Sequence, residues 1–309
     1  MNQIEHWTVA DIDEVVALLN RASPEDRFEL GVIRGAVFGD PDYDPNFLLC
    51  VREGGKIVGA ISAEIRRSRD EPPDAPVGHV KLLAVAPDHQ RRGLGGVLLD
   101  GVERQFLAAG VTKSRIFADS PTYLRPGVDF RLTSFVCFLL RRGYSAPKNA
   151  VNMVVDLAAA KLDTAADETR LRESGIEFRR LAASDAEGFQ TYLGKEWGWS
   201  WQSEAIQALQ RDPVSCHLAL RDGQFVGWSC HNIDQPGHFG PMAVNADVRR
   251  SGVGSVLLRR CLTDLRHEGW AEADIQWVGP ITFYSREVGA TLSRCFFQFE
   301  RQLGGAVQL

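Results

Sequence analysis

A short pattern of residues occurs twice in this chain and constrains its fold more than any other feature. In residues 82–99, an apolar run leads into the turn QRRGLG and then into an apolar helix start, VLL. In residues 241–258, a similar run leads into RRSGVG and again into VLL. The spacing is constant, since Gly93 to Gly252 is 252 − 93 = 159 positions and Val85 to Val244 is 244 − 85 = 159. This repetition predicts two similar domains.

Each copy of the pattern has the composition of an anion-binding turn. Glycine leaves the backbone accessible, and the amide groups and dipole at the start of a helix attract phosphate. A tight strand-to-helix turn without a ligand is the structural alternative. The sequence therefore predicts a phosphate cradle in each half, formed by Gln90, Arg91, Arg92, Gly93, Leu94 and Gly95 and by Arg249, Arg250, Ser251, Gly252, Val253 and Gly254.

Both halves place the same elements in the same order around the turn. We expect a short strand, a helix, a hairpin, a central strand, the turn with its helix, another strand, a last helix and a closing strand. This order predicts a mixed α/β sheet in each of two tandem domains, residues 1–157 and 176–309. The polar residues 158–175 are the expected linker.

The first half is longer than the second before its last helix. Gly143 and Gly289, which are expected to end the two last helices, are separated by 289 − 143 = 146 positions. The first half therefore has 159 − 146 = 13 extra residues there. We assign this insertion to the region of residues 120–127.

Composition favours a soluble, cytoplasmic protein. The 309 residues suffice for two domains, and 44% apolar and 24% charged residues are typical of globular proteins. No apolar run approaches the roughly 20 residues that span a membrane, and the first residues do not resemble a signal peptide. The formal net charge of −5 argues against nucleic-acid binding. The six cysteines are scattered without metal-ligand spacing, so we expect no metal site.

The repeated turn resembles the signature of the GNAT acetyltransferase superfamily, in which Gln/Arg-x-x-Gly-x-Gly/Ala follows the fourth strand. The resemblance covers nearly the whole chain, and double-domain members of similar length include mycothiol synthase. It implies two tandem GNAT domains that use acetyl-CoA as acyl donor, bound in a V-shaped opening between the fourth and fifth strands. It also implies that the backbone of Val85 or Val244 faces the thioester, where an amide stabilises the oxyanion.

The resemblance further implies an acid that protonates the thiolate of CoA, often a tyrosine in the last helix. Aligned on the glycine that ends this helix, Tyr284 stands where the first half has Phe138. This difference predicts that the C-terminal domain carries out the chemistry. His238, which follows His79 by 159 positions, is a candidate base, and Glu196 acting through water is another. Purely structural roles for Tyr284 and His238 stay open.

We therefore expect direct acetylation of a primary amine, most readily on a small molecule. Three tryptophans beside Glu196 either line an acceptor pocket or pack a short helix against the sheet: Trp197, Trp199 and Trp201. A protein or peptide N-acetyltransferase and a non-catalytic CoA-binding sensor or scaffold are the alternatives. The expected partners are acetyl-CoA and the amine, in a monomer or homodimer, without nucleic acid or membrane.

Overall fold

A computed structural model describes four stretches of the chain: residues 3–66, 75–120, 122–233 and 235–304. Residue 121, within the expected insertion, lies outside them. The chain divides into two compact units. Unit 1 comprises Met1–Ala150 and Phe296–Leu309, and unit 2 comprises Val151–Cys295.

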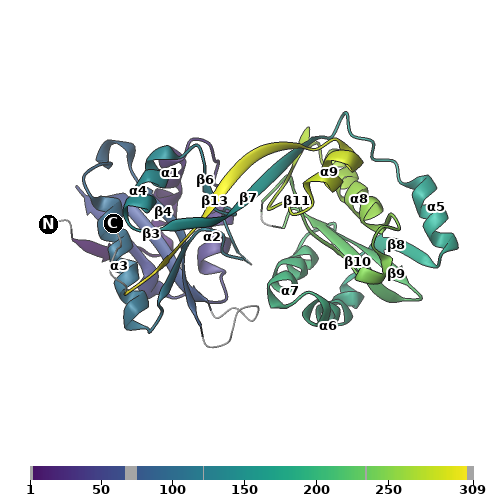
Figure 1. Ribbon diagram of the computed structural model, residues 1–309, viewed down its shortest axis with the longest axis horizontal. Helices are drawn as coiled ribbons and strands as arrows, with labels where there is room; N and C mark the ends of the chain where they lie inside the picture. The colour runs from purple at the N-terminus through teal and green to yellow at the C-terminus, as the bar shows by residue number, and fades with distance from the viewer. Residues whose placement is uncertain (1–2, 67–74, 121, 234, 305–309) are drawn as a thin grey trace. The chain divides into compact units, whose positions relative to one another are not determined.

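Unit 1 is a mixed sheet flanked by helices (Figure 1). Its strand order is β1-β2-β3-β4-β5-β13, and all neighbours are antiparallel except β4 and β5. Helices α1 and α3 pack on β3 and β4. The elements are β1 (Ile4–His6), α1 (Ile12–Ala22), α2 (Leu30–Phe38), β2 (Leu48–Glu53), β3 (Lys56–Arg66), β4 (Val77–Val85), α3 (Leu94–Ala108), β5 (Lys113–Ile116), β6 (Val128–Asp129), α4 (Thr133–Arg141) and parts of β7 (Ser145–Asp156) and β13 (Thr291–Gln302).

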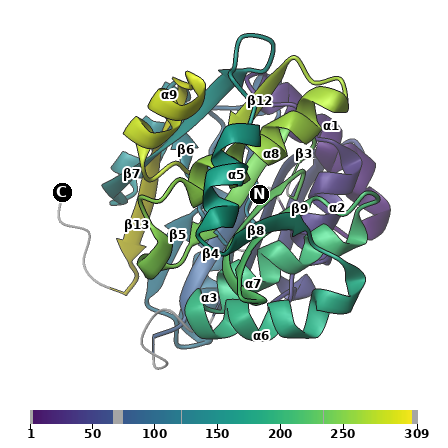
Figure 2. The ribbon, with the colours of Figure 1, turned by 90° about the vertical axis from the view of Figure 1, so that its right-hand side faces the viewer.

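Unit 2 repeats this architecture. Its strand order is β7-β12-β11-β10-β9-β8, with a parallel pair at β11 and β12. Helix α8 packs on β9, β10 and β11, while α5 lies beside β8 and α8 (Figure 2). The elements are α5 (Ala165–Glu173), β8 (Ile176–Arg180), α6 (Ala186–Glu196), α7 (Trp199–Ala205), β9 (Cys216–Arg221), β10 (Gln224–His231), β11 (His238–Val244), α8 (Val253–His267), β12 (Glu272–Ile275) and α9 (Ile281–Val288).

The closing strands are exchanged between the two halves of the sequence. In unit 1, β13 from the end of the chain pairs with β5, with Phe299 opposite Ile116. In unit 2, β7 from the first half pairs with β12, with Val155 opposite Ala273. The units therefore differ from the expected domains, residues 1–157 and 176–309, because each unit ends with a strand from the other half.

Local patterns explain why these elements form. In α1 the apolar residues Ile12, Val15 and Leu19 recur at helical spacing and are buried. Just before this helix, the Thr8 hydroxyl accepts a hydrogen bond from the Ala10 amide, and the Asp11 carboxylate accepts one from the Thr8 amide. In the hairpin between β2 and β3, Gly54 has a φ of 59°, a conformation that glycine adopts easily.

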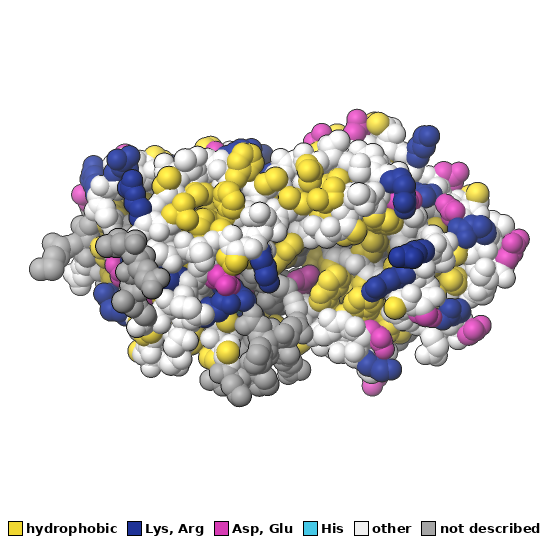
Figure 3. All heavy atoms as spheres, viewed as in Figure 1, with side chains coloured by type: hydrophobic (Ala, Val, Ile, Leu, Met, Phe, Trp, Pro, Cys, Tyr) yellow, Lys and Arg dark blue, Asp and Glu magenta, His cyan; other side chains and the backbone are white. Residues whose placement is uncertain are grey.

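The surface carries charges of both signs. Figure 3 shows lysine and arginine side chains interspersed with acidic ones on the face that it draws, without one continuous basic area. None of the helices in the described stretches is both long and apolar enough to cross a membrane.

Candidate functional site

The first glycine turn has the backbone of an anion cradle. Strand β4 ends at Val85, and α3 begins at Leu94 after a turn in which Arg91 and Gly93 have φ of 65° and 83°. A Cβ added at Gly93 would meet nothing within 4 Å, so the space in front of the turn is open. The Gln90 side chain donates to the Val85 carbonyl (Nε2–O 3.1 Å). Gln90 therefore ties the turn to the strand, and its role in binding the ligand stays a prediction.

The second turn repeats this geometry. Strand β11 ends at Val244, and Arg250 and Gly252 have φ of 64° and 106° before α8. The Arg249 side chain donates to the Val244 carbonyl (Nε–O 3.1 Å), as Gln90 does in unit 1. The two turns are thus equivalent in backbone and in side-chain tether.

Each sheet splays open beside its turn. The β4–β5 pairing ends at Val80 opposite Ile116, although β4 continues to Val85. Because Ala86 N–H donates to Val58 O on one edge of β4, the alternation of an antiparallel ladder directs the Val85 N–H to the opposite edge, where β5 has ended. Val244 has the same arrangement, since Asn245 N–H donates to Val226 O. These strand-end amides face the two splayed openings.

A large cavity lies at the first turn. Its volume is about 880 Å³, and it contains the strand edge at Leu83–Val85 and the turn residues Gln90, Arg91, Gly93, Leu94 and Gly95. Arg92 is not among its lining residues and is exposed near Glu53. The opposite walls come from the end of α1 with the following loop and from one face of α4.

Positive charge dominates the cavity wall. Five arginines and one carboxylate, Glu25, line it. Arg91 and Arg141 have no ion pair in the described part of the chain, so two cations remain for an anionic ligand. The other three arginines pair with aspartates, as Arg125–Asp26, Arg131–Asp129 and Arg142–Asp100.

The second turn is covered by a side chain of α5. Arg170 donates to the Ser251 carbonyl (Nη1–O 3.0 Å). A Cβ added at Gly252 would come within 2.8 Å of Arg170 Nη2, whereas the same test at Gly93 meets nothing. The two cradles therefore differ, since only that of unit 2 has a guanidinium of its own chain in front of the glycine.

The last helices show that the expected equivalence of Tyr284 and Phe138 is wrong. A Cβ at Gly95 would contact Phe138 and the Val85 side chain, and one at Gly254 would contact Phe283 in the same way. Phe283 is therefore the counterpart of Phe138. The comparison of Tyr284 with Phe138 gives no reason to place the chemistry in unit 2.

Tyr284 is a buried residue of unit 2. Its ring packs edge-on against Phe239 and Phe283, and burial raises the pKa of its hydroxyl. The hydroxyl thus keeps its proton at neutral pH. Its role as the acid stays a prediction.

His238 lies at the wrong end of β11 to act directly on a thioester at Val244. Val244 lies six positions after His238 on this strand, a span of at most about 20 Å at about 3.3 Å per residue. Burial also lowers the pKa of His238 to about 4. His79 occupies the corresponding place on β4, and burial lowers its pKa to about 4 as well.

Two of the three tryptophans that follow Glu196 pack toward the sheet of unit 2. Trp201 contacts Trp197 and the fully buried Trp228 of β10, with ring centroids 5.9 Å apart in both pairs. Trp199 begins α7, and Glu196 pairs with Lys195 (3.5 Å). Of the two roles considered for these tryptophans, packing of a short helix against the sheet therefore describes Trp197 and Trp201.

Several lining residues of the cavity were missed by the sequence analysis. Glu25 follows α1, and Phe135 and Arg141 belong to α4. They match no motif, and the amphipathic pattern of α4 was the only signal that one of its faces is buried.

Comparison with known families and structures gives a consistent result. The model of the acetyltransferase (GNAT) family matches residues 12–122 and 179–282. A search of curated proteins found no match.

Solved structures with the same fold cover nearly the whole chain. A GCN5-related glucosamine N-acetyltransferase region of a fungal multi-domain GH3 β-N-acetylglucosaminidase has a TM-score of 0.79 at 17% identity, and the alignment covers 97% of this chain and 38% of that one. A tandem GNAT protein of the clavulanic acid biosynthesis pathway has a TM-score of 0.70 at 16% identity, with 99% and 100% covered. A GCN5-related N-acetyltransferase from Sphaerobacter thermophilus has a TM-score of 0.68 at 16% identity, with 99% and 97% covered.

Proposed function

The chain belongs to the GNAT acetyltransferase family, and we propose that it transfers the acetyl group of acetyl-CoA to a primary amine of a small molecule in unit 1. The observation that carries this proposal is the open cradle at Gly93, which continues into a cavity of about 880 Å³. A cavity of this volume lies within the range of small-ligand sites.

The choice of unit 1 departs from the expectation that the C-terminal domain is catalytic. Two differences between the cradles support it. The space before Gly93 is open, whereas Arg170 lies over Gly252. In addition, Arg91 and Arg141 in the cavity wall can pair with the phosphates of CoA.

The residues of unit 1 fit the chemistry of acyl transfer. The amides of the turn and the start of α3 would bind the pyrophosphate, and the free edge of β4 at Leu83–Val85 would run beside the pantetheine. The neutral amine nitrogen attacks the thioester carbon and forms the amide C–N bond, the C–S bond breaks, and the sulfur leaves as thiolate. The nitrogen loses one proton, and the thiolate takes up one, so the products are the amide and CoA thiol. The Val85 N–H would stabilise the oxyanion, and Glu25 would attract the ammonium group of the acceptor.

Calorimetric titration with acetyl-CoA tests the location of the site. We expect the native chain to bind one equivalent, and Gly93→Glu to weaken binding at least 100-fold because a carboxylate would face the pyrophosphate. Gly110→Glu is the matched control, because Gly110 is also left-handed (φ 78°), open and exposed but lies after the other end of α3. Binding that is lost only in Gly252→Glu would place the site in unit 2, and no binding in the native chain would refute the proposal.

Thiol release separates catalysis from binding alone. We expect CoA thiol to appear when acetyl-CoA and glucosamine, as a probe amine, are mixed with the native chain. Release with a lysine-containing peptide but not with glucosamine would favour the protein or peptide alternative. Tight binding without release for either acceptor would favour a sensor.

A further inference from the structure

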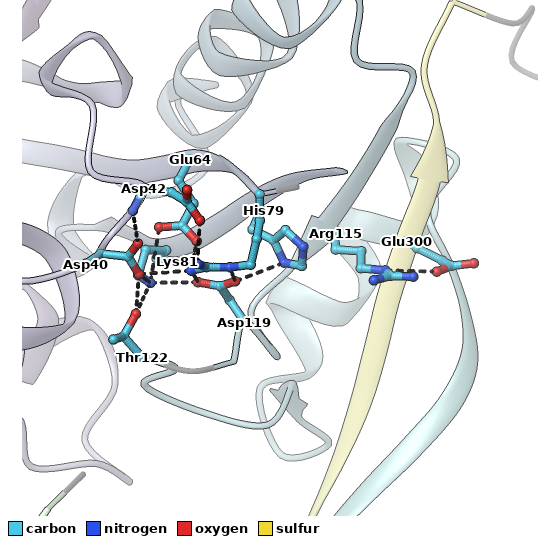
Figure 4. Close-up of polar contacts among 10 residues, drawn as sticks. Asp40, Asp42, Glu64, His79, Lys81, Arg115, Asp119, Thr122 and Glu300 are labelled. Carbon is cyan, nitrogen blue, oxygen red and sulfur yellow. Dashed lines mark hydrogen bonds and ion pairs between the residues drawn. The ribbon is translucent and has the colours of Figure 1, made fainter. Parts of the chain in front are cut away.

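A network of buried charges lies at the point where β4 and β5 separate. Figure 4 shows its side chains pointing toward one another from four segments of unit 1. The members are Asp40 and Asp42 after α2, Glu64 and Arg66 on β3, His79 and Lys81 on β4, and Asp119 and Thr122 after β5.

The network has two cations: Arg66, which contacts Asp40, Glu64 and Asp119, and Lys81. The Lys81 Nζ lies 2.6 Å from Asp40 Oδ2, 2.6 Å from Asp119 Oδ2 and 2.7 Å from Thr122 Oγ1. The Lys81 ammonium group therefore joins the segment after α2 to the segment after β5, as the Arg66 guanidinium also does through Asp40 and Asp119. Lys81 adds the contact with Thr122. Asp40, Glu64 and Asp119 could together hold a metal ion, but the Lys81 ammonium already contacts all three carboxylates.

The backbone places Lys81 at the vertex of the splayed strands. Ser62 of β3 lies opposite Leu82, and Ala63 lies opposite Val80, so Lys81 is the extra residue of a β-bulge. Lys81 also follows directly after Val80, the last residue of β4 that pairs with β5. A bulge here turns the lysine side chain into the network.

Unit 2 has the same fold without these charges. The offset of 159 also relates the last parallel pair of each unit, since 275 − 116 = 159 and 239 − 80 = 159. It places Gly240 at the position of Lys81 and Val278 at that of Asp119. The fold therefore does not require the network.

Stability alone is also a poor reason for the network. The side chains of Lys81 and Arg66 are only 2% and 3% exposed. The free-energy cost of removing such charged groups from water offsets most of their Coulombic attraction to the carboxylates. Burial and the neighbouring Asp119 raise the pKa of Glu64 to about 10, which shows how unfavourable a further negative charge is there. Replacing buried ion pairs by apolar side chains of similar volume is often neutral or stabilising in proteins.

The segment that Lys81 holds forms one wall of the cavity. Phe117 and Arg125, on either side of Asp119 and Thr122, line it. Lys81 itself lines a small recess that shares Leu19, Leu83, Phe117 and Arg125 with the large cavity. The Arg125 guanidinium lies over the rings of Phe28 and Phe117, at 4.8 and 5.4 Å from their centroids. Phe117, before Asp119, and Arg125, after Thr122, are therefore packed together in one wall.

We propose that Lys81 is a positioning residue that fixes the wall after β5 and thereby sets the shape of the cavity on the side of Phe117 and Arg125, to which we assign the acceptor amine. The proposal rests on the proposed function for its catalytic consequence. It does not place Lys81 in contact with acetyl-CoA, since the turn that binds the phosphates lies beyond Val85.

Three variants of the full chain test this role. Lys81→Met removes the ammonium group and keeps most of the stem. The double variant Lys81→Met/Asp40→Asn also removes one of the carboxylates that Lys81 neutralises. It replaces the single variant in the experiment if Lys81→Met does not fold. Lys56→Met, at an exposed lysine of β3, is the control.

We expect hydrogen exchange to accelerate at least tenfold in residues 117–120 and 122–132 of the Lys81 variants and to stay within twofold in β2. With glucosamine as the acceptor, KM should rise at least tenfold while kcat stays within threefold. The Kd for acetyl-CoA should also stay within threefold. This split between KM and kcat distinguishes positioning from a general loss of stability.

Three results would overturn the proposal: unchanged exchange in these residues, faster exchange throughout unit 1, or failure of both Lys81 variants to fold. Failure of the proposed function gives a different result. In that case the native chain neither binds acetyl-CoA nor acetylates glucosamine, while the exchange data still decide whether Lys81 holds the wall.

Discussion

At the scale of single residues, buried histidines link protonation to stability. Burial lowers the pKa of His79, His231 and His238 to about 4, below the usual value of about 6.5. Between these two pH values the unfolded chain binds more protons than the folded chain. The free energy of unfolding therefore falls as the pH falls from about 6.5 toward 4.

Replacing one of these residues should flatten the pH dependence. We expect His238→Gln to lose less stability than the native chain between pH 6.5 and 5, by up to about 2 kcal/mol, since each such histidine contributes up to about 1.4 kcal/mol per pH unit. Urea unfolding at the two pH values measures this difference. His267→Gln, at an exposed position of α8, should leave the slope unchanged. Equal slopes for His238→Gln and the native chain would contradict the expectation.

Single residues also show where the sequence was a sufficient guide and where it was not. Gly93 and Gly252 identified both cradles, because a left-handed turn before a helix leaves a strong local signal. The alignment of Tyr284 with Phe138 failed because the two last helices end differently. Helix α9 runs to Val288, next to its glycine, whereas α4 stops at Arg141 and leaves one residue between helix and glycine.

At the scale of elements, α5 distinguishes the two cradles. Its residues were expected to belong to the linker, and its position over the second turn had no local signal. Glu168 and Arg260 form a two-pronged ion pair (2.8 and 2.7 Å), and Asp167 pairs with Arg259 (2.9 Å), so α5 is fixed to α8. These contacts place Arg170 over Gly252.

Removing this side chain should expose the second cradle. We expect Arg170→Ala to bind a second equivalent of acetyl-CoA in a calorimetric titration, because the space in front of Gly252 becomes open as it is at Gly93. Arg172→Ala, on the same helix, is the control and should bind one equivalent. An unchanged stoichiometry in Arg170→Ala would mean that more than this guanidinium closes the turn.

At the scale of the whole molecule, the order of elements was predictable but the partners of the closing strands were not. The hydrophobic pattern of a strand specifies which face is buried, and β7 and β13 have the expected positions in the sequence. The pattern does not specify which of two sheets with the same strand order a closing strand joins. A repeat makes the two choices similar in sequence, so the exchange is visible only in the pairing of β13 with β5 and of β7 with β12.

The exchange predicts that substitutions in each closing strand destabilise the unit built mainly from the other half. Phe299 of β13 is buried in the core of unit 1, and Met153 of β7 is buried in that of unit 2. We expect each alanine variant to lose about 2–5 kcal/mol of stability. Phe299→Ala should accelerate hydrogen exchange in β4 and β5, although these strands lie far earlier in the chain. Met153→Ala should accelerate hydrogen exchange in β12 and α8.

The control is Leu292→Ala, in the same strand as Phe299 but 55% exposed, which should change exchange in neither unit. Domains at residues 1–157 and 176–309 would give the reverse result, with Phe299→Ala affecting β11 and β12 and Met153→Ala affecting β4 and β5. The two assignments thus predict opposite patterns in the same experiment. Because each unit needs its closing strand to cover an edge of its sheet, the pattern also decides whether either half of the sequence can fold without the other.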